Sequence, residues 1–341
     1  MELTLILLTN AVFAIALILT GALRRYALHV ELIDQAGHRS AHHTPTPRGG
    51  GASIVLSTLL ATAASPWLLG VSSDLVFGLV GGGIAVAMVG WLDDHGHVPP
   101  LVRLAAHFAA AIWLIWWIGP LPLDLIVFWQ ADWIVGAGLV SVLFVVWMVN
   151  LYNFMDGIDG LAAGLTLVVV LGGVVVASGT GLGSLPVIAI PLVLAAATMG
   201  FLPWNWPPAR IFMGDVSSGF LGFMLAALVL AMGTVAPRLA YAWAILPGVF
   251  IADATVTLIR RLLRREKVYE AHRSHAYQRW TRRVGGHLPI TVSALAITWL
   301  WLFPLAYLIA TETIGETAGV VTAMLPLFVG ALLLGAGDRG A

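Results

Sequence analysis

Long apolar runs, separated by short polar connections, follow one another along almost the whole chain. Eleven runs approach the roughly 20 apolar residues that a helix needs to cross a bilayer. They lie at about 3–23, 51–70, 75–92, 101–119, 133–152, 161–178, 184–203, 217–235, 240–260, 288–310 and 317–335. No run alternates apolar and polar residues over about ten positions, as a membrane-spanning strand does. The pattern predicts an all-α, polytopic membrane protein with about eleven transmembrane helices in one domain, residues 1–341.

The composition supports the same class of protein. Of the 341 residues, 60% are hydrophobic and 10% are charged, whereas a typical soluble domain carries about 25% charged residues. The formal net charge is zero, so no bulk positive charge favours nucleic acid. Cysteine is absent, which excludes disulfides, thiolate catalysis and cysteine-ligated metal sites. The first run lacks a basic leader segment and ends at Arg24 and Arg25, which predicts an uncleaved helix.

The basic residues are distributed unevenly between the connections. With eleven spans, all 17 lysines and arginines except Arg238 fall in the odd-numbered connections or the C-terminal tail. Basic residues concentrate in cytoplasmic connections. The pattern therefore predicts an N-terminus outside, a C-terminus inside, and polar clusters of chemical interest that face the cytoplasm.

The first cytoplasmic connection contains the sequence GHRSAHHTPTPRGGG, residues 37–51. Its prolines stiffen the turn, and its glycines would allow close backbone approach to a ligand. Arg48, with Arg39, His42 and His43, could hold an anion, since the arginine fork matches phosphate oxygens. A basic turn without a ligand explains the same residues.

The second cytoplasmic connection, GWLDDHGHVPP, places Asp93 and Asp94 at the inner end of the third predicted helix. Adjacent carboxylates repel each other, and a divalent cation relieves that repulsion. Hard oxygen ligands suit Mg²⁺. The alternative is a solvated helix end at which one aspartate acts as a cap.

The third cluster, NLYNFMDGIDGLAAG, repeats amides and acids at every third position: Asn150, Asn153, Asp156 and Asp159. If the fifth helix continues through this stretch, residues three apart share one of its faces. Gly157 and Gly160 would then loosen the chain and turn Asp159 toward the same site. Amides offer donors and acceptors for a sugar or a base edge. The alternative is a polar loop with capping residues.

Two further clusters lie beyond the seventh predicted helix. In IFMGDVSSGFLG, Asp215 starts the eighth helix and could hold a metal ion that bridges to a phosphate, or could belong to a capping box. In the basic stretch 260–283, His272, His275 and Arg279 share a face if the segment is helical. That segment could also be an amphipathic helix on anionic lipid. Asp253, inside the ninth run, is expected to face a polar interior or to pair with a base, in a structural or a catalytic role.

Five stretches resemble, in order, the signature loops of one enzyme family. They are TPTPRGGG, GWLDD, NLYNFMDGIDGLAAG, IFMGDVSSGFLG and AHRSHAYQR, and they run from about Arg39 to Arg283. The chain is similar to the polyprenyl-phosphate N-acetylhexosamine-1-phosphate transferases. Tyr277 and Gln278 stand where many members have further histidines. This departure resembles the subgroup that initiates O-antigen synthesis with FucNAc or QuiNAc.

The resemblance implies an activity and its partners. Members transfer a 2-acetamido-sugar-1-phosphate from a UDP-N-acetylhexosamine to undecaprenyl phosphate, release UMP and use Mg²⁺, with Mn²⁺ as the alternative metal. The implied setting is the bacterial inner membrane, with the site on the cytoplasmic side and a homodimer as one assembly. A GlcNAc-1-phosphate transferase or a phospho-MurNAc-pentapeptide transferase of the same family is the alternative. A different class, a transporter or flippase of lipid-linked sugars, would also use membrane acids.

The resemblance also implies roles for individual residues. The expected catalytic residues are Asp93, Asp94, Asp156, Asp159 and His275. The expected metal ligands are Asp215 and Asp94. The expected substrate-binding residues are Arg48, Asn150, Asn153, Arg273 and Arg279. Arg273 and Arg279 would bind the pyrophosphate together with His275. The nucleotide sugar would be oriented by Asn150, Asn153, Asp156 and Asp159.

Overall fold

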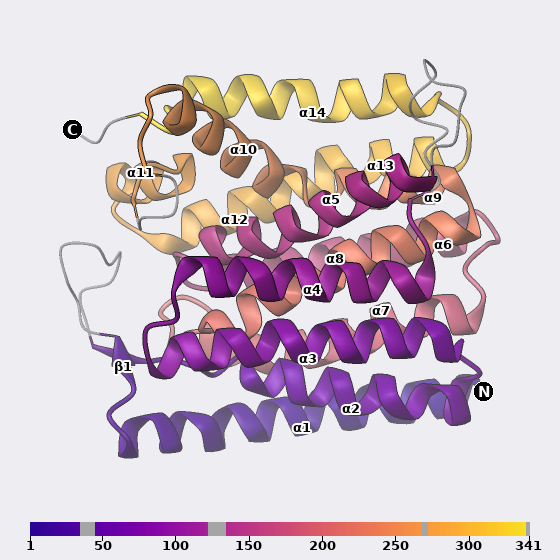
Figure 1. The fold of residues 1–341 in the computed structure, drawn as a ribbon, viewed down its shortest axis with the longest axis horizontal. Helices are drawn as coiled ribbons and strands as arrows, with labels where there is room; N and C mark the ends of the chain where they lie inside the picture. The colour runs from indigo at the N-terminus through magenta and orange to yellow at the C-terminus, as the bar shows by residue number, and fades with distance from the viewer. Residues whose placement is uncertain (35–44, 122–133, 268–271, 339–341) are drawn as a thin grey trace.

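The computed structural model describes residues 1–34, 45–121, 134–267 and 272–338. Arg39, His42 and His43 lie outside these ranges. The helices run side by side along the molecule (Figure 1). They are α1 (Glu2–His29), α2 (Ala52–Leu69), α3 (Ser73–His95), α4 (Pro100–Ile118), α5 (Ile134–Met155), α6 (Leu161–Gly179), α7 (Leu185–Asn205), α8 (Asp215–Val235), α9 (Pro237–Ile245), α10 (Gly248–Leu263), α11 (Ala276–Val284), α12 (His287–Ile297), a π-helical turn η1 (Thr298–Leu302), α13 (Phe303–Ala310) and α14 (Glu316–Leu333).

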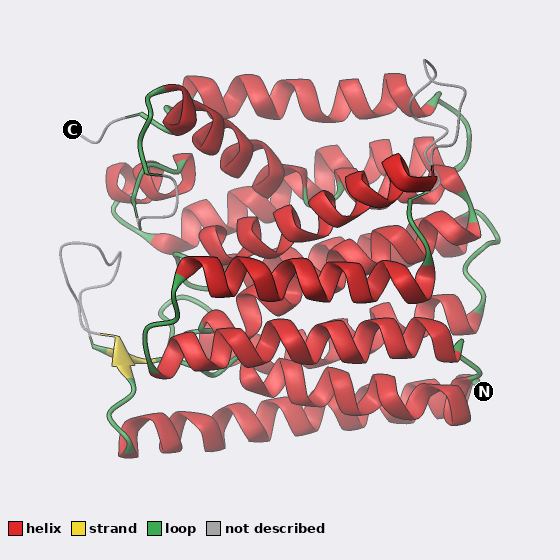
Figure 2. Cartoon of the chain, in the orientation of Figure 1, coloured by secondary structure: helices red, strands yellow, loops and turns green. Residues whose placement is uncertain are grey.

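Within the described residues, β structure is limited to one antiparallel pair, β1 (Ile33–Asp34) and β2 (Thr46–Pro47), and the rest is helix and loop (Figure 2). In the part of the chain that the structure describes, ten helical segments are long and apolar enough to cross a membrane, with α12, η1 and α13 counted as one. The bent pair α9–α10 makes an eleventh if it forms one span. The prediction of an all-α, polytopic membrane protein is confirmed.

The ninth predicted run, 240–260, is not a single straight helix. The chain forms α9, breaks, and continues as α10 with a bend of 70°. Pro247 lies in the break. A proline has no backbone N–H and its ring clashes with the preceding turn, so it interrupts a helix there. The sequence pattern missed the bend because apolar residues continue through it.

The two termini lie at opposite ends of the bundle (Figure 1). An odd number of crossings requires this arrangement. The arrangement agrees with eleven spans, in which α9 and α10 together make one crossing. The β1–β2 pair lies at the same end as the C-terminus (Figure 1).

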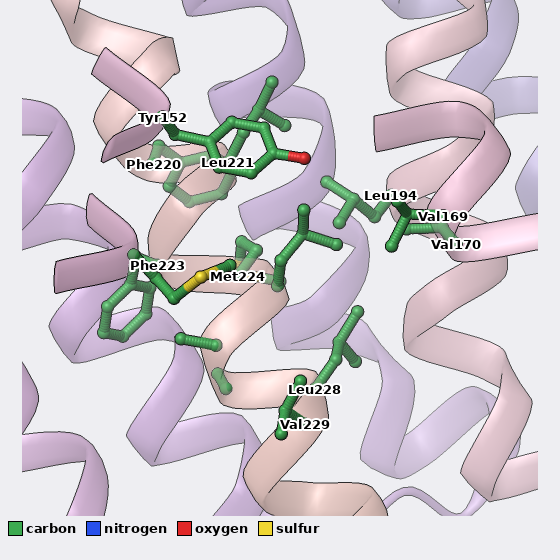
Figure 3. Close-up of a cluster of buried hydrophobic side chains, with 14 of the residues drawn as sticks. Tyr152, Val169, Val170, Leu194, Phe220, Leu221, Phe223, Met224, Leu228 and Val229 are labelled. Carbon is green, nitrogen blue, oxygen red and sulfur yellow. The ribbon is translucent and has the colours of Figure 1, made fainter. Parts of the chain in front are cut away.

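Helix α8 occupies the centre of the core. Its side chains are almost all buried, and it packs against α3, α5 and α9. Phe220, Phe223 and Met224 of α8 belong to one buried apolar cluster with Tyr152 of α5 and Leu194 of α7 (Figure 3). Because α8 is held on several sides, its first residue, Asp215, has a fixed place at one end of the core.

Close packing against α8 depends on a glycine in α3. A Cβ atom added to Gly90 would lie 2.2 Å from the carbonyl oxygen of Asp215. Real Cβ atoms do not approach backbone so closely, so a larger residue here would push α3 away from the start of α8. Small residues allow backbones to approach in this way in membrane helix bundles.

Candidate active site

A cavity opens between α3, α4, α5 and the first turns of α8. Its lining residues are Val86, Val89, Gly90, Arg103, His107, Asn150, Asn153, Phe154, Asp215 and Gly219. Three of them, Asn150, Asn153 and Asp215, were predicted as site residues. The structure thus brings the inner ends of α5 and α8 together around one opening.

Arg103 and His107 of α4 were not predicted as site residues. Both line the cavity, one helical turn apart. A signal was available in the sequence, since ionisable residues within an apolar membrane helix usually face a polar interior or a functional site. In the sequence, Arg103 lies near the start of the fourth run and was instead counted among the charges of the cytoplasmic connections.

Arg103 links two of the predicted acids. Its guanidinium forms an ion pair with the Asp93 carboxylate and lies 3.6 Å from an Asp215 carboxylate oxygen. Asp93 also accepts the backbone N–H of Val98 at 2.9 Å. The Asp215 side chain keeps 38% of its surface exposed. Of these two acids, Asp215 is therefore the one that presents its carboxylate to the cavity.

Asp94 has a different environment from its neighbour. It is 2% exposed, and its two carboxylate oxygens accept the backbone N–H groups of Asp215 and Val216, each at 3.0 Å. These N–H groups belong to the first turn of α8, which has no partners for them within the helix. Asp94 therefore caps α8 from α3. A direct contact between Asp94 and a metal ion stays a prediction.

The connection between α1 and α2 packs against the segment before α8. The N–H groups of Gly50 and Gly51 donate to the carbonyls of Phe212 and Met213, both at 2.9 Å. A Cβ atom on Gly51 would lie 2.3 Å from the Cβ of Ser217. These glycines therefore approach the protein's own chain at the start of α8, and their expected approach to a ligand stays a prediction.

Arg48 lies in the same connection and is half-buried. Its guanidinium donates to the backbone carbonyl of Asp94. Arg48 therefore ties this connection to the end of α3. Its predicted contact with substrate phosphate stays a prediction.

The inner end of α5 carries the two asparagines on one face. The helix continues to Met155, as the spacing required, and both amides line the cavity. Asn153 donates to the Ser218 hydroxyl at 3.0 Å, and its side chain also interacts with the Asp215 carboxylate. Asn150 donates to the Val146 carbonyl at 2.7 Å and lies 3.3 Å from Nδ1 of His107.

Asp156 follows α5 and lies near three other acids. Burial raises the pKa of the Asp156 carboxyl well above its ordinary value, and the charges of Asp215, Asp94 and Asp159 raise it further. A proton or a bound cation relieves such repulsion. The acids of this end of the bundle therefore form one electrostatic group, although their carboxylates point to different partners.

Asp159 has partners outside the cavity. Its carboxylate accepts the N–H of Ala209 at 2.9 Å and lies 3.1 Å from Nδ1 of His287. Its backbone carbonyl accepts the Thr291 hydroxyl at 2.9 Å. These contacts join the start of α6 to α12 and to the segment after α7. The predicted catalytic role of Asp159 stays a prediction, and its position is one that organises the loops.

The loop before α11 brings the predicted histidine to the end of α5. The His275 side chain is buried, and its ring lies 6.2 Å from the ring of Phe154, which lines the cavity. Tyr277 donates its hydroxyl to the Phe154 carbonyl at 3.0 Å. Burial raises the pKa of the Tyr277 hydroxyl well above its ordinary value, and nearby Asp253 and Asp156 add to this, so it stays a donor. His275 itself does not line the cavity, as far as the described residues define it.

The two predicted arginines of this loop are placed differently from the expectation. Arg279 donates to the backbone carbonyl of Asp338, beyond α14, at 3.4 Å. The carbonyl of Arg273 accepts from Arg282 at 3.3 Å. Neither arginine is among the residues that line the cavity. Their predicted contact with pyrophosphate stays a prediction that requires the loop to move.

The donor set at the cavity fits a hard divalent cation. Asp215 presents a partly exposed carboxylate, and Asn153 beside it has an amide oxygen. Within the described residues, no three His, Asp or Glu side chains already converge on a point where a metal could sit. Mg²⁺ usually keeps several waters and takes one or two carboxylates together with substrate phosphates. Asp215 could hold such an ion, with water and phosphate as the other ligands.

Comparison with known proteins identifies the family. Residues 76–233, which include the cavity, match the model of glycosyl transferase family 4. The chain is 31% identical over 273 residues to a probable undecaprenyl-phosphate N-acetylglucosaminyl 1-phosphate transferase of Bacillus subtilis, covering 77% of this chain and 73% of the relative.

Two other relatives are named for a different lipid or a different sugar. A decaprenyl-phosphate N-acetylglucosaminephosphotransferase of Mycobacterium tuberculosis is 34% identical over 246 residues, covering 66% of this chain and 59% of the relative. A phospho-N-acetylmuramoyl-pentapeptide-transferase of a Synechococcus species is 29% identical over 254 residues, covering 67% of this chain and 65% of the relative. With its five ordered motifs and its multi-pass helical fold, the chain belongs to glycosyl transferase family 4, the polyprenyl-phosphate hexosamine-1-phosphate transferases.

Proposed function

We propose that this protein transfers a 2-acetamido-sugar-1-phosphate from a UDP-sugar to undecaprenyl phosphate. An oxygen of the lipid phosphate attacks the β-phosphorus of the donor and forms the new P–O bond. The bond to the bridging oxygen breaks, and UMP leaves with that electron pair. The observation that carries this proposal is the cavity lined by Arg103, Asp215 and the two asparagines of α5, with Arg103 within ion-pair distance of both Asp93 and Asp215.

The main barrier in this reaction is the approach of two anions. A phosphate monoester has a second pKa near about 6, so the lipid phosphate is mostly a dianion at neutral pH and needs no strong base. Arg103 places a guanidinium at the cavity wall, and its pairing with Asp93 offsets part of that charge. Bound at Asp215, Mg²⁺ or Mn²⁺ would offset the remaining repulsion and stabilise charge on the leaving UMP.

The contacts of the acids favour distinct roles. Asp93 is held by Arg103 and by the Val98 N–H, which suits a residue that orients the arginine. Asp94 holds the first turn of α8 and thereby fixes Asp215. Asn150 and Asn153 offer amides at the cavity for the nucleotide sugar. In this proposal Asp156 and Asp159 shape the adjoining loop and its charge.

Two observations favour different sugars. The loop AHRSHAYQR resembles that of enzymes that use FucNAc or QuiNAc to initiate O-antigen synthesis. The Bacillus and Mycobacterium relatives are named as enzymes that transfer N-acetylglucosamine phosphate, which favours GlcNAc. The proposed setting is the inner membrane of a bacterium, with the cavity on the cytoplasmic side, because that side holds the basic connections.

The test is release of UMP by the purified protein in detergent. The assay contains undecaprenyl phosphate, Mg²⁺ and a panel of UDP-N-acetylhexosamines that includes GlcNAc, FucNAc and QuiNAc. Release that requires both the lipid and Mg²⁺ supports the proposal, and the donor with the highest kcat/KM identifies the sugar. Donor binding without release, by folded protein and with every donor, would contradict it.

The same assay separates a transporter from a transferase. Transport needs a sealed compartment, whereas chemical turnover does not. The charged and polar cavity side chains lie at one end of the helices, and the middle of α8 is packed with apolar side chains such as Phe223 and Leu228 (Figure 3). A transport path would need polar groups near the midplane, so the described core favours the enzyme.

A further inference from the structure

The acid inside the bent span, Asp253 of α10, has partners that the proposed reaction does not use. Its side chain is buried, and its two carboxylate oxygens accept the N–H groups of Ala276 at 2.9 Å and Tyr277 at 3.0 Å. Both N–H groups belong to the first turn of α11, where a helix has no internal partners for them. Asp253 therefore caps a helix that starts 23 residues further along the chain.

His275 is the residue directly before this capped turn. Its Nδ1 lies 3.4 Å from Oδ1 of Asp253, and its side chain is only 3% exposed. The Thr257 hydroxyl donates to the same carboxylate oxygen at 3.2 Å and so holds the carboxylate in place. The His272 ring stacks on the imidazole, with 4.9 Å between ring centroids. The imidazole is thus enclosed between an acid and an aromatic ring.

The loop is also fixed on either side of His275. The Ser274 carbonyl accepts the N–H of Gly337, beyond α14, at 2.7 Å. Tyr277 donates its hydroxyl to the carbonyl of Phe154 at 3.0 Å, and Phe154 lines the cavity. Residues next to the histidine are therefore tied to α10, to α5 and to the segment after α14. Among the described residues, the contact from α10 is the only one of these three that a carboxylate makes.

We propose that Asp253 is a positioning residue that fixes the His275 loop, and the imidazole itself, relative to the cavity. This inference rests on the proposed function, because it assigns His275 a place in that reaction. Asp253 does not touch the cavity and acts only through the loop. A residue that merely stabilised the whole bundle would have the same burial but would not act specifically through His275.

The first readout does not depend on activity. In Asp253→Asn, the amide oxygen can accept one N–H, while the amide NH₂ opposes the other. We expect hydrogen exchange in peptides spanning 272–280 to become at least about tenfold faster, the order of one lost hydrogen bond to a charged group. Peptides from α8 should keep their wild-type rates. Unchanged exchange in 272–280 would overturn the proposal.

The second readout is a double-mutant cycle on kcat/KM. If Asp253 acts through His275, Asp253→Asn lowers kcat/KM by about tenfold in the wild-type background and by less than about twofold in a His275→Ala background. Equal losses in both backgrounds would show general structural damage and would overturn the proposal. An inactive wild-type protein would contradict the proposed transferase function, while the exchange result would still decide whether Asp253 holds the loop.

Two further variants keep the test decisive. Thr255 lies in the same helix as Asp253, and its buried hydroxyl has no hydrogen-bond partner within the described residues. Thr255→Val should therefore leave hydrogen exchange and activity at wild-type levels. Thr257→Val keeps the carboxylate but removes its hydroxyl donor. It should change exchange and kcat/KM in the same direction as Asp253→Asn, by a smaller factor, and it serves if Asp253→Asn does not fold. No change in Thr257→Val exchange would count against the proposal.

Discussion

At the scale of single residues, two buried carboxylates organise the site from a distance. Asp94 accepts two N–H groups at the start of α8, and Asp253 does the same at the start of α11. The sequence predicted a catalytic and metal-binding role for Asp94, because adjacent carboxylates such as Asp93 and Asp94 can share a cation. It could not show the capping role, since the N–H partners lie more than 120 residues further along the chain. Such pairings exist only once the helices pack.

Asp215→Asn tests the residue that presents its carboxylate to the cavity. We expect kcat to fall by about 10²–10³-fold, a range typical for loss of one charge-stabilising group. We expect the apparent melting temperature to stay equal or rise, since removing one negative charge relieves repulsion among the neighbouring acids. Thermal unfolding in detergent and UMP release measure the two effects. A fall in both would instead indicate a structural role.

Asp94→Asn tests the cap on α8. The amide can accept only one of the two N–H groups, so we expect stability to fall by about 1 kcal/mol, a typical capping loss. Activity should fall with it, because Asp215 is the first residue of the capped helix. The matched control is Asp74→Asn in the first turn of α3, an exposed acid that should be neutral in both assays. A fully stable but inactive Asp94→Asn would favour direct metal contact over capping.

At the scale of helices, apolar length predicted the spans well. Ten predicted runs match described helical spans, and α5 continues to Met155 as the asparagine spacing required. Length and periodicity carry no information about bends within an apolar segment or about which helices adjoin. They therefore missed the break between α9 and α10, and the inward-facing Arg103 and His107 of α4. The predicted roles of Arg273 and Arg279 rested on the motif alone. The contacts of these residues depend on how distant segments pack, which a motif does not specify.

Gly90→Ala tests the contact between α3 and α8. The added methyl group would meet the Asp215 carbonyl at 2.2 Å, and backbone cannot yield as a flexible side chain does. We expect a loss of about 1–3 kcal/mol from overpacking, together with reduced activity, because the displaced group is the backbone of Asp215. Melting temperature and UMP release are the measurements. Gly138→Ala in α5, where a Cβ meets nothing within 4 Å, is the control and should be neutral.

At the scale of the whole molecule, the charge pattern predicts which end of the bundle faces the cytoplasm. The termini lie at opposite ends (Figure 1), and the cavity residues Asp215 and Arg103 lie in the first turns of α8 and α4. Arg238, the one basic residue assigned to the outer side, forms an ion pair with Glu312 of the connection before α14. A paired arginine there adds no net positive charge to the outer face.

The orientation can be measured because the chain has no cysteine. We expect Ser184→Cys, in the exposed connection between α6 and α7, to react with a membrane-impermeant maleimide in intact cells. Arg283→Cys, at the exposed end of α11, should react only after the membrane is permeabilised. Labelling in the reverse order would place the cavity outside the cell. The unsubstituted protein, which cannot be labelled at sulfur, is the control.

The most direct test of the central claim follows the phosphorus atom. The donor is a UDP-N-acetylhexosamine that carries radioactive phosphorus at the β position, and the acceptor is undecaprenyl phosphate. We predict that the label enters the lipid fraction with the sugar while unlabelled UMP is released, that this requires Mg²⁺, and that Asp215→Asn slows it by about 10²–10³-fold. Sugar in the lipid with the label retained in released UDP would contradict the account, because the protein would then transfer a sugar without its phosphate.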